Sequence, residues 1–86
     1  YEVALLYFQK KEYKESLKNV KKTIKNYAGE LDVILGNAYL LEGMAYDKLS
    51  KRIKAKQSYR KCIELKNFST AMKKAEKYLE RSFSEI

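Results

Sequence analysis

Residues 39–67 read YLLEGMAYDKLSKRIKAKQSYRKCIELKN, and this stretch decides the fold. Small and aromatic side chains stand about one helical turn apart in two groups: Tyr39, Gly43 and Tyr46, then Ala55, Tyr59 and Cys62. A Gly between two aromatic residues at this spacing indicates that two helices cross too closely at Gly43 for a side chain to fit. The stretch therefore predicts an antiparallel pair of helices.

The rest of the sequence favours an all-α chain. The 86 residues contain no Pro and only three Gly, and apolar residues follow helical spacing throughout. A chain of this length forms one domain at most and buries only about 60–65% of its unfolded surface, so its core is thin. Because residue 1 already lies in an expected helix, we interpret residues 1–86 as a single domain taken from a longer chain.

Apolar spacing predicts five helices, at about 1–9, 12–27, 32–49, 52–65 and 70–84. The third differs from the others, because apolar side chains lie all round it and Glu42 is the only charged residue between Val33 and Tyr46. Such a helix packs on more than one side, so we expect it to be the central element. We also expect Gly29 to break the chain before this helix and Ser69 to be the N-cap of the last one.

The helix pair in the quoted stretch resembles a tetratricopeptide repeat. Its six small and aromatic residues stand at the family's characteristic positions, with Cys62 in place of a usual Ala. Two positions depart from the pattern, since Glu42 stands where Leu is usual and Asn67 where Pro often ends the repeat. Neither change removes the close contact that we expect between Gly43 and Ala55 at the crossing.

The flanking helices repeat this order more weakly. In the first pair Ala4, Tyr7, Ser16 and Val20 match Gly43, Tyr46, Ala55 and Tyr59 in turn, with the same offset in both helices. This offset exceeds the family period of about 34 residues by about five, so we place the extra residues around 27–31, in the second helix or the loop after it. The last helix matches the third at a slightly shorter offset, through Ala71, Ala75 and Tyr78, and is expected to be the solvating cap of the array.

The resemblance implies an all-α, right-handed superhelix of about five helices, or about two and a half repeats. Its hairpins would span about 1–27 and 32–66, and the capping helix about 70–84. An unrelated helix bundle with one tight crossing is the alternative, but it does not explain the joint spacing of these residues. The residues expected to pack the scaffold are Ala4, Tyr7, Tyr39, Gly43, Tyr46, Ala55, Tyr59, Cys62, Ala75 and Tyr78.

In this family the first helix of each pair lines a concave groove, which implies a binding surface on the first, third and fifth helices. This surface is unusually apolar, so it requires a cover. Either it binds a peptide or helix of a partner protein, or the parent protein or a partner subunit fills it and the domain organises a larger protein. The implied groove residues are Leu5, Phe8, Asn37, Leu40, Met44, Asp47, Met72, Glu76 and Leu79, together with Tyr1 and Ser69.

One subgroup of the family clamps the C-terminal carboxylate of chaperone tails with Lys, Asn and Arg side chains in the groove. The matching positions here hold Tyr1, Leu5 and Leu41, and only Lys73 is basic. We therefore predict that the chain does not bind acidic chaperone tails. Micromolar binding of such a peptide would contradict this prediction.

The sequence lacks the parts of a catalytic or metal site. It has no His and no phosphate-binding Gly loop, so we predict no enzymatic activity, no cofactor and no metal ion. Glu42 is expected to pair with a Lys or Arg of a neighbouring helix, and Cys62 to be a buried, protonated thiol. The single Cys allows a reducing environment but does not identify the compartment, and we expect a cytoplasmic rather than a secreted protein. The apolar run at 33–46 is too short to span a membrane.

The net charge of +8 leaves other functions open. A basic surface could bind nucleic acid or anionic lipid, but 16 of the 19 basic residues are Lys, whereas specific nucleic-acid surfaces favour Arg. No aromatic residues are interleaved for base stacking, so we expect only weak, salt-labile binding. A non-catalytic domain attached to an enzyme is the remaining alternative. The basic residues in question are Lys14, Lys18, Lys21, Lys25, Arg52, Lys56, Arg60 and Lys66.

Overall fold

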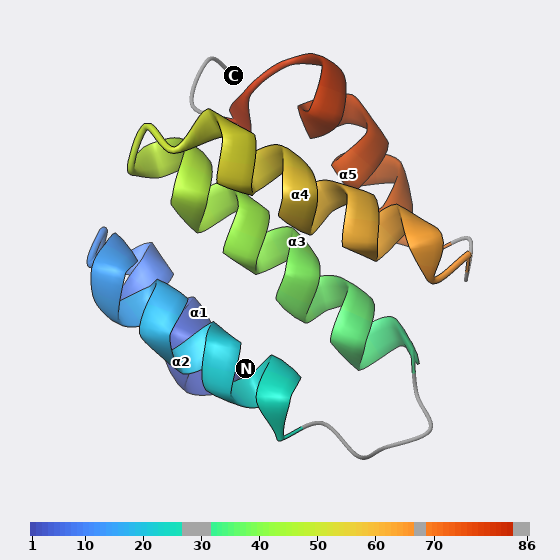
Figure 1. Cartoon of the computed structure of the whole chain (residues 1–86). Coiled ribbons are helices and arrows are strands. Elements are labelled where there is room, and N and C mark those ends of the chain that lie inside the picture. The colour runs from blue at the N-terminus through green and yellow to red at the C-terminus, as the bar shows by residue number, and fades with distance from the viewer. Residues whose placement is uncertain (27–31, 67–68, 84–86) are drawn as a thin grey trace.

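A computed structural model describes residues 1–26, 32–66 and 69–83 of the chain. These residues form five α-helices and no β-strand, which confirms the all-α prediction (Figure 1). The expected breaks at Gly29 and Asn67 lie outside the described residues. The helices are α1 (Glu2–Gln9), α2 (Tyr13–Lys25), α3 (Asp32–Lys48), α4 (Arg52–Glu64) and α5 (Thr70–Glu80).

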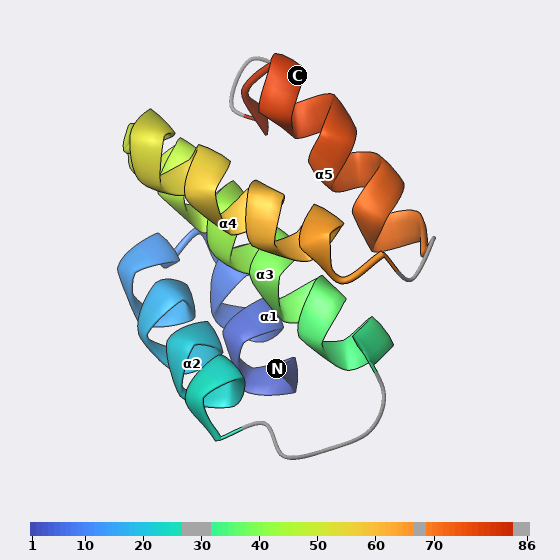
Figure 2. The same ribbon diagram turned by 45° about the vertical axis from the view of Figure 1, so that its right-hand side comes forward.

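Helix α3 is the central element, as its apolar surface predicts. It packs against α2 on one side and α4 on the other, and α5 lies against both α4 and α3 (Figures 1 and 2). Two buried clusters make up the core, and α3 contributes to both. Leu41 and Ala38 belong to the cluster shared with α1 and α2, whereas Leu40 and Tyr46 belong to the cluster shared with α4 and α5.

The turns inside the two hairpins have the same backbone geometry. Lys11 in the first turn and Ser50 in the second both adopt left-handed backbone conformations, with φ of 63° and 60°. The N–H of the residue after each of them donates to a carbonyl five residues earlier, over 2.9 Å in the first turn and 2.8 Å in the second. Lys11 and Ser50 are separated by the same offset as Ala4 and Gly43, so the turns match in the register that the sequence predicts.

The extra residues relative to the family period do not lengthen the second helix. Helices α2 and α4 both have 13 residues and begin at matching positions, Tyr13 and Arg52. Instead α3 begins seven residues before Tyr39, whereas α5 begins one residue before Ala71, which is the matching position. Helix α3 thus has more residues before its matching position than α5 has, and the expected place of the extra residues, 27–31, lies outside the described residues.

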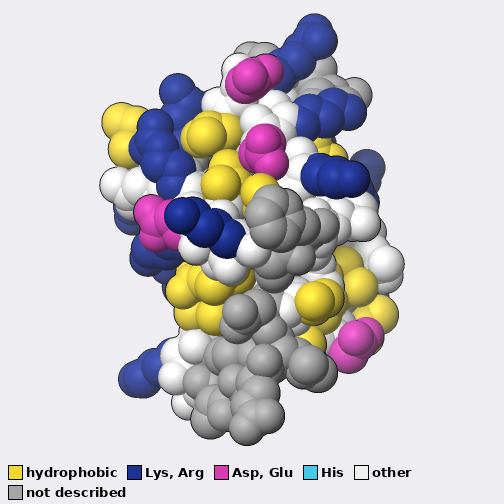
Figure 3. Space-filling view, turned by 90° about the vertical axis from the view of Figure 1, so that its right-hand side faces the viewer, with side chains coloured by type: hydrophobic (Ala, Val, Ile, Leu, Met, Phe, Trp, Pro, Cys, Tyr) yellow, Lys and Arg dark blue, Asp and Glu magenta, His cyan; other side chains and the backbone are white. Residues whose placement is uncertain are grey.

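The early start of α3 brings apolar side chains to the surface. Val33 is 50% exposed and Ile34 is 44% exposed. Figure 3 views the molecule from the side on which α3 begins, and hydrophobic side chains reach the surface there in separate patches between Lys and Arg. These two residues would be poorly placed in water unless another surface covers them.

Helix α5 begins as predicted but ends early. Ser69 is its N-cap, because the hydroxyl accepts a hydrogen bond from the N–H of Met72 over 3.3 Å. The helix ends at Glu80 instead of continuing to about residue 84, because Arg81 is extended and turns the chain back. The N–H of Phe83 then donates to the Asp47 carboxylate over 3.0 Å, and this bond holds the returning segment against the end of α3.

Candidate interaction site

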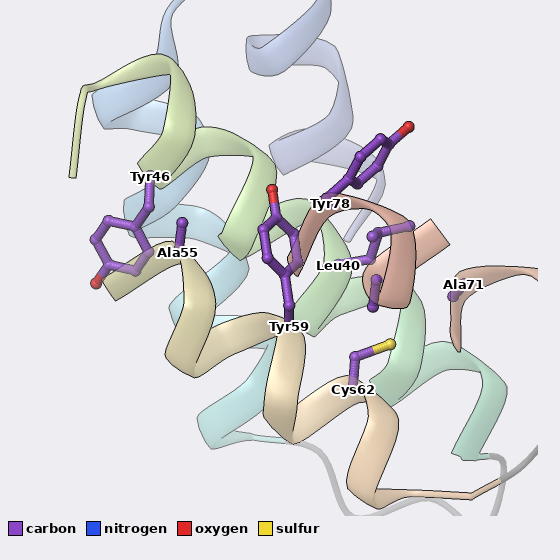
Figure 4. Packing of buried hydrophobic residues seen from close by; sticks show 8 residues of the cluster. Leu40, Tyr46, Ala55, Tyr59, Cys62, Ala71 and Tyr78 are labelled. Atoms are coloured by element: carbon purple, nitrogen blue, oxygen red, sulfur yellow. The ribbon is translucent and has the colours of Figure 1, made fainter. Parts of the chain in front are cut away.

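The crossing of α3 and α4 at Gly43 is as close as its spacing predicts, but its closest partner is Tyr59 and not Ala55. A Cβ atom on Gly43 would lie 2.3 Å from Cε1 of Tyr59. The Tyr59 ring is fully buried and reaches from α4 towards Leu40 and Tyr78 (Figure 4). Gly43 is therefore needed because the ring occupies the space that a side chain would fill.

A buried hydrogen bond holds the Tyr59 ring in this position. Its hydroxyl donates to Oδ2 of Asp47 over 2.7 Å. Burial, and then this hydrogen bond and the negative charge of Asp47, raise the pKa of the Tyr59 phenol above its usual value. The phenol thus remains a donor at physiological pH, and the ring cannot swing away from Gly43 without losing the bond.

Asp47 is the junction of three elements and is not available to a groove ligand, in contrast to its predicted place. Its side chain is 1% exposed. Besides the bonds from Tyr59 and Phe83, it accepts two from Nη1 of Arg52, at 3.2 and 3.0 Å. Nη2 of Arg52 donates to the carbonyl of Leu79 over 2.9 Å, so the same ion pair also ties down α5. A carboxylate with this many donors is structural.

Five of the predicted groove residues do come together. A hollow of about 350 Å³ lies between α1, α3 and α5. Among the groove residues it is lined by Leu5, Phe8, Asn37, Leu40 and Met44, and by Tyr1 beside them. Two helices that are remote in sequence therefore present their apolar side chains to one space, and we call this space the α1–α3–α5 hollow.

The α5 side of the hollow differs from the prediction. Lys74 and Tyr78 line it, whereas Met72, Glu76 and Leu79 do not. By helical spacing, the three predicted residues lie on a different face of α5 from Lys74 and Tyr78, and Tyr78 packs with Phe83 at 5.2 Å between ring centroids. The sequence indicates Tyr78 only as a scaffold residue, and it carries no signal that would have identified Lys74. Gln9 and Leu41 complete the lining; the sequence indicated Leu41 only as a position of the carboxylate clamp and did not indicate Gln9.

Glu42 and Cys62, the two side chains that were considered as reactive groups, have the structural roles that the sequence predicts. Glu42 lies 3.5 Å from Nζ of Lys21 on α2, and the hydroxyl of Ser58 donates to it over 2.7 Å. The thiol of Cys62 donates to the carbonyl of Gly36 over 3.3 Å, and burial raises the pKa of this thiol to about 11. In the described residues no group of acidic, His or Cys side chains has the arrangement of a metal site, and no helix is long and apolar enough to cross a membrane.

Comparison with known protein families gives a match in the α3–α4 hairpin. Residues 36–68 match the family model of the tetratricopeptide repeat, which is consistent with the resemblance that the residues of the helix pair α3–α4 show. Such repeats generally mediate protein–protein interactions and are typically non-catalytic scaffolds. Comparison with curated proteins found no match, and comparison with solved structures found none either.

Proposed function

We propose that the chain is a protein–protein interaction scaffold and that the α1–α3–α5 hollow binds apolar side chains of a partner peptide or helix. The observation that carries this proposal is the convergence of five predicted groove residues from α1 and α3 on one space. The family role of the α3–α4 pair supports a protein partner.

The size of the hollow sets what it can hold. Its volume of about 350 Å³ is near the lower end of ligand pockets, which run from about 300 to 1,000 Å³. It therefore suits one or two anchoring side chains of a partner, with the rest of the partner lying across its rim. Leu40 provides a buried wall, whereas Met44 is only half-buried and has a flexible side chain that adapts to different shapes.

Polar groups at the rim would orient the partner. Asn37 supplies an amide that can both donate and accept hydrogen bonds, and Lys74 supplies a positive charge from α5. An apolar anchor followed by an acidic or amide side chain would match this arrangement. The same hollow could instead be filled by another part of the parent protein, in which case the scaffold would organise that protein.

The two methionines of the chain allow a direct test, because Met44 lines the hollow and Met72 lies outside it. Peptides selected from a random library would be titrated into protein labelled with ¹³C at the Met methyl groups. We expect the Met44 methyl signal to shift and the Met72 signal to stay. The Met44→Glu variant should lose the selected peptides, and the matched Met72→Glu variant should keep them.

Several results would contradict the proposal. Peptides that shift only Met72, or that bind Met44→Glu as well as they bind the unaltered chain, would place the contact elsewhere. Failure to select any peptide, with folded protein, would favour an intramolecular occupant of the hollow. Thermal unfolding of both variants is the control for their folding.

A further inference from the structure

A second hollow lies on a different part of the molecule and shares no lining residue with the α1–α3–α5 hollow. Its volume is about 490 Å³, and it lies between α2 and the turn that joins α3 to α4. Its lining consists of four lysines and two leucines: Lys14, Leu17, Lys18, Lys21, Leu49 and Lys51. We call it the lysine hollow.

The repeat geometry brings these residues together. Lys14, Leu17, Lys18 and Lys21 follow one another at helical spacing and so lie on one face of α2. The other two come from the α3–α4 turn, where the left-handed conformation of Ser50 places Leu49 and Lys51 on either side of the bend. Leu17 and Leu49 are half-buried, so the hollow combines an apolar floor with a basic rim.

Most of this positive charge has no ion-pair partner in the part of the chain that the structure describes. Lys21 is paired with Glu42 at 3.5 Å, and its ammonium also lies 5.1 Å from the centre of the Tyr46 ring. Within the described ranges, no carboxylate lies within ion-pair distance of Lys14, Lys18 or Lys51. Like charges that share one face repel one another, and an anionic partner would relieve this repulsion.

The surroundings limit the partner further. Ile53, which is 77% exposed, lies with Lys51 and Lys54 beside an adjoining surface hollow. On the other side of Lys14, a shallow hollow is lined by Glu12 and Glu15 as well as by Lys11, so the surface there carries both charges and is no longer purely basic. The favourable region is therefore short, basic and partly apolar, which suits a segment with a few acidic residues and not a long polyanion.

We propose that the lysine hollow binds an acidic segment of a protein, with an apolar residue on Leu17 and Leu49 and carboxylates on Lys14, Lys18 and Lys51. The apolar floor favours a protein segment over nucleic acid, because no aromatic residue lines the hollow for base stacking. Arg52, which follows Lys51 in the chain, is already engaged by Asp47 and by the carbonyl of Leu79, so it cannot supply forked contacts to phosphate.

The test uses a fluorescein-labelled synthetic peptide in which two Leu are flanked by Asp and Glu, and measures its binding by fluorescence anisotropy. We expect the double variant Lys14→Glu with Lys18→Glu to weaken binding about tenfold or more, because each reversal replaces attraction with repulsion. The matched double variant Lys73→Glu with Lys77→Glu makes the same change in net charge on exposed positions of α5, and should weaken binding about twofold at most.

The apolar floor is tested separately. A peptide with Ser in place of both Leu should bind about tenfold more weakly, because it loses the contact with Leu17 and Leu49. Equal effects of the two double variants would overturn the proposal, since net charge alone would then explain binding. No binding at millimolar peptide would also overturn it.

The other anionic partners are measured in parallel. Single-stranded DNA of mixed sequence and vesicles rich in phosphatidylserine are titrated under the same salt conditions. If either binds as tightly as the peptide and with the same dependence on Lys14 and Lys18, the hollow is a general anion surface and the proposal is wrong. Neither outcome bears on the α1–α3–α5 hollow, because the Met44 methyl signal reports on that hollow independently.

Discussion

The two hairpins have the same backbone plan, yet they fill their crossings with side chains of different sizes. In the second hairpin Gly43 on α3 faces the large ring of Tyr59 on α4. In the first hairpin the corresponding residues are Ala4 on α1 and Val20 on α2, and both are fully buried in one cluster. Ala4 has one methyl group more than Gly43, and the side chain of Val20 is smaller than that of Tyr59. Both crossings are thus filled, while the division of the space between the helices differs.

Polar contacts at the two crossings differ as well. In the first hairpin Ser16 on α2 donates to the carbonyl of Ala4 over 2.7 Å. Near the turn, Phe8 and Tyr13 pack edge to face at 5.2 Å between centroids, where the second hairpin has the ion pair of Asp47 and Arg52. The first hairpin therefore joins its helices at this end by apolar contact, and the second by charge.

The largest effect should come from adding a side chain at the second crossing. We expect Gly43→Leu to destabilise the chain by about 3 kcal/mol or more and Gly43→Ala by about 1–3 kcal/mol, because the Tyr59 ring cannot move away. Chemical denaturation measures both values. The sharper version copies the first hairpin: the double variant Gly43→Ala with Tyr59→Val should lose less stability than the sum of the losses of the two single variants.

The comparison of the two crossings would be contradicted if the stability losses of Gly43→Ala and Tyr59→Val simply added in the double variant. In that case Gly43 and Tyr59 would not share one space, and the Gly would have another role. Ala4→Gly is the reciprocal control. It should cost about 1 kcal/mol, mainly through the greater flexibility of Gly within a helix.

The next largest effect should come from Asp47→Ala. Arg52, the Tyr59 hydroxyl and the Phe83 N–H would all lose their acceptor, and we expect a loss of about 2–3 kcal/mol. Calorimetry measures the loss, and the contribution of the Tyr59 hydroxyl follows from Tyr59→Phe, which removes only one of these bonds. A cost near zero for Asp47→Ala would show that the charged junction does not hold the second hairpin.

A smaller effect is expected at the first crossing. Ser16→Ala removes the buried bond to the carbonyl of Ala4 and should cost about 1 kcal/mol. Asn19→Ala is the matched control, because Asn19 makes a similar but solvent-exposed side-chain bond to a carbonyl of the same helix. Denaturation midpoints of the two variants decide the matter, and equal midpoints would contradict the importance that we assign to burial.

The smallest effect tests what the hairpins share. Lys11→Gly and Ser50→Gly should each stabilise the chain by roughly 0.5–1 kcal/mol, because Gly adopts the left-handed conformation without strain. The two gains should be equal within error in thermal unfolding, since the turns have the same geometry. Unequal gains would show that the turns are alike in shape but carry different strain.

Much of the fold could be predicted from sequence because the decisive residues act through volume. Gly43 and Tyr59 at helical spacing specify a crossing regardless of what surrounds it, and the register between the two hairpins follows from counting along the chain. The start of α3 at residue 32 was predicted as well, because Val33 and Ile34 continue its apolar pattern. The sequence left open whether the extra residues of the longer offset lie in the second helix or in the loop after it. Period alone does not distinguish a longer helix from a longer connection.

The candidate site was predictable only in part. The helical spacing placed Leu40 and Met44 on one face of α3, and the hollow contains both. The same spacing placed Asp47 on that face, but in the structure its carboxylate accepts hydrogen bonds from Arg52 of α4 and from the N–H of Phe83, which follows α5. The contacts of Asp47 depend on pairing between segments that are far apart in the chain. The spacing of residues along one helix does not show such pairing.

The bond from the Phe83 N–H to Asp47 makes the last described turn of the chain a reporter of the repeat before it. A backbone amide that donates to a side chain on α3 is shielded from solvent exchange only while that side chain is in place. Amide exchange at Phe83 should therefore follow the opening of the α3–α4 turn and not the fraying of α5. Loosening at one end of the repeat would thus be visible 36 residues away along the chain.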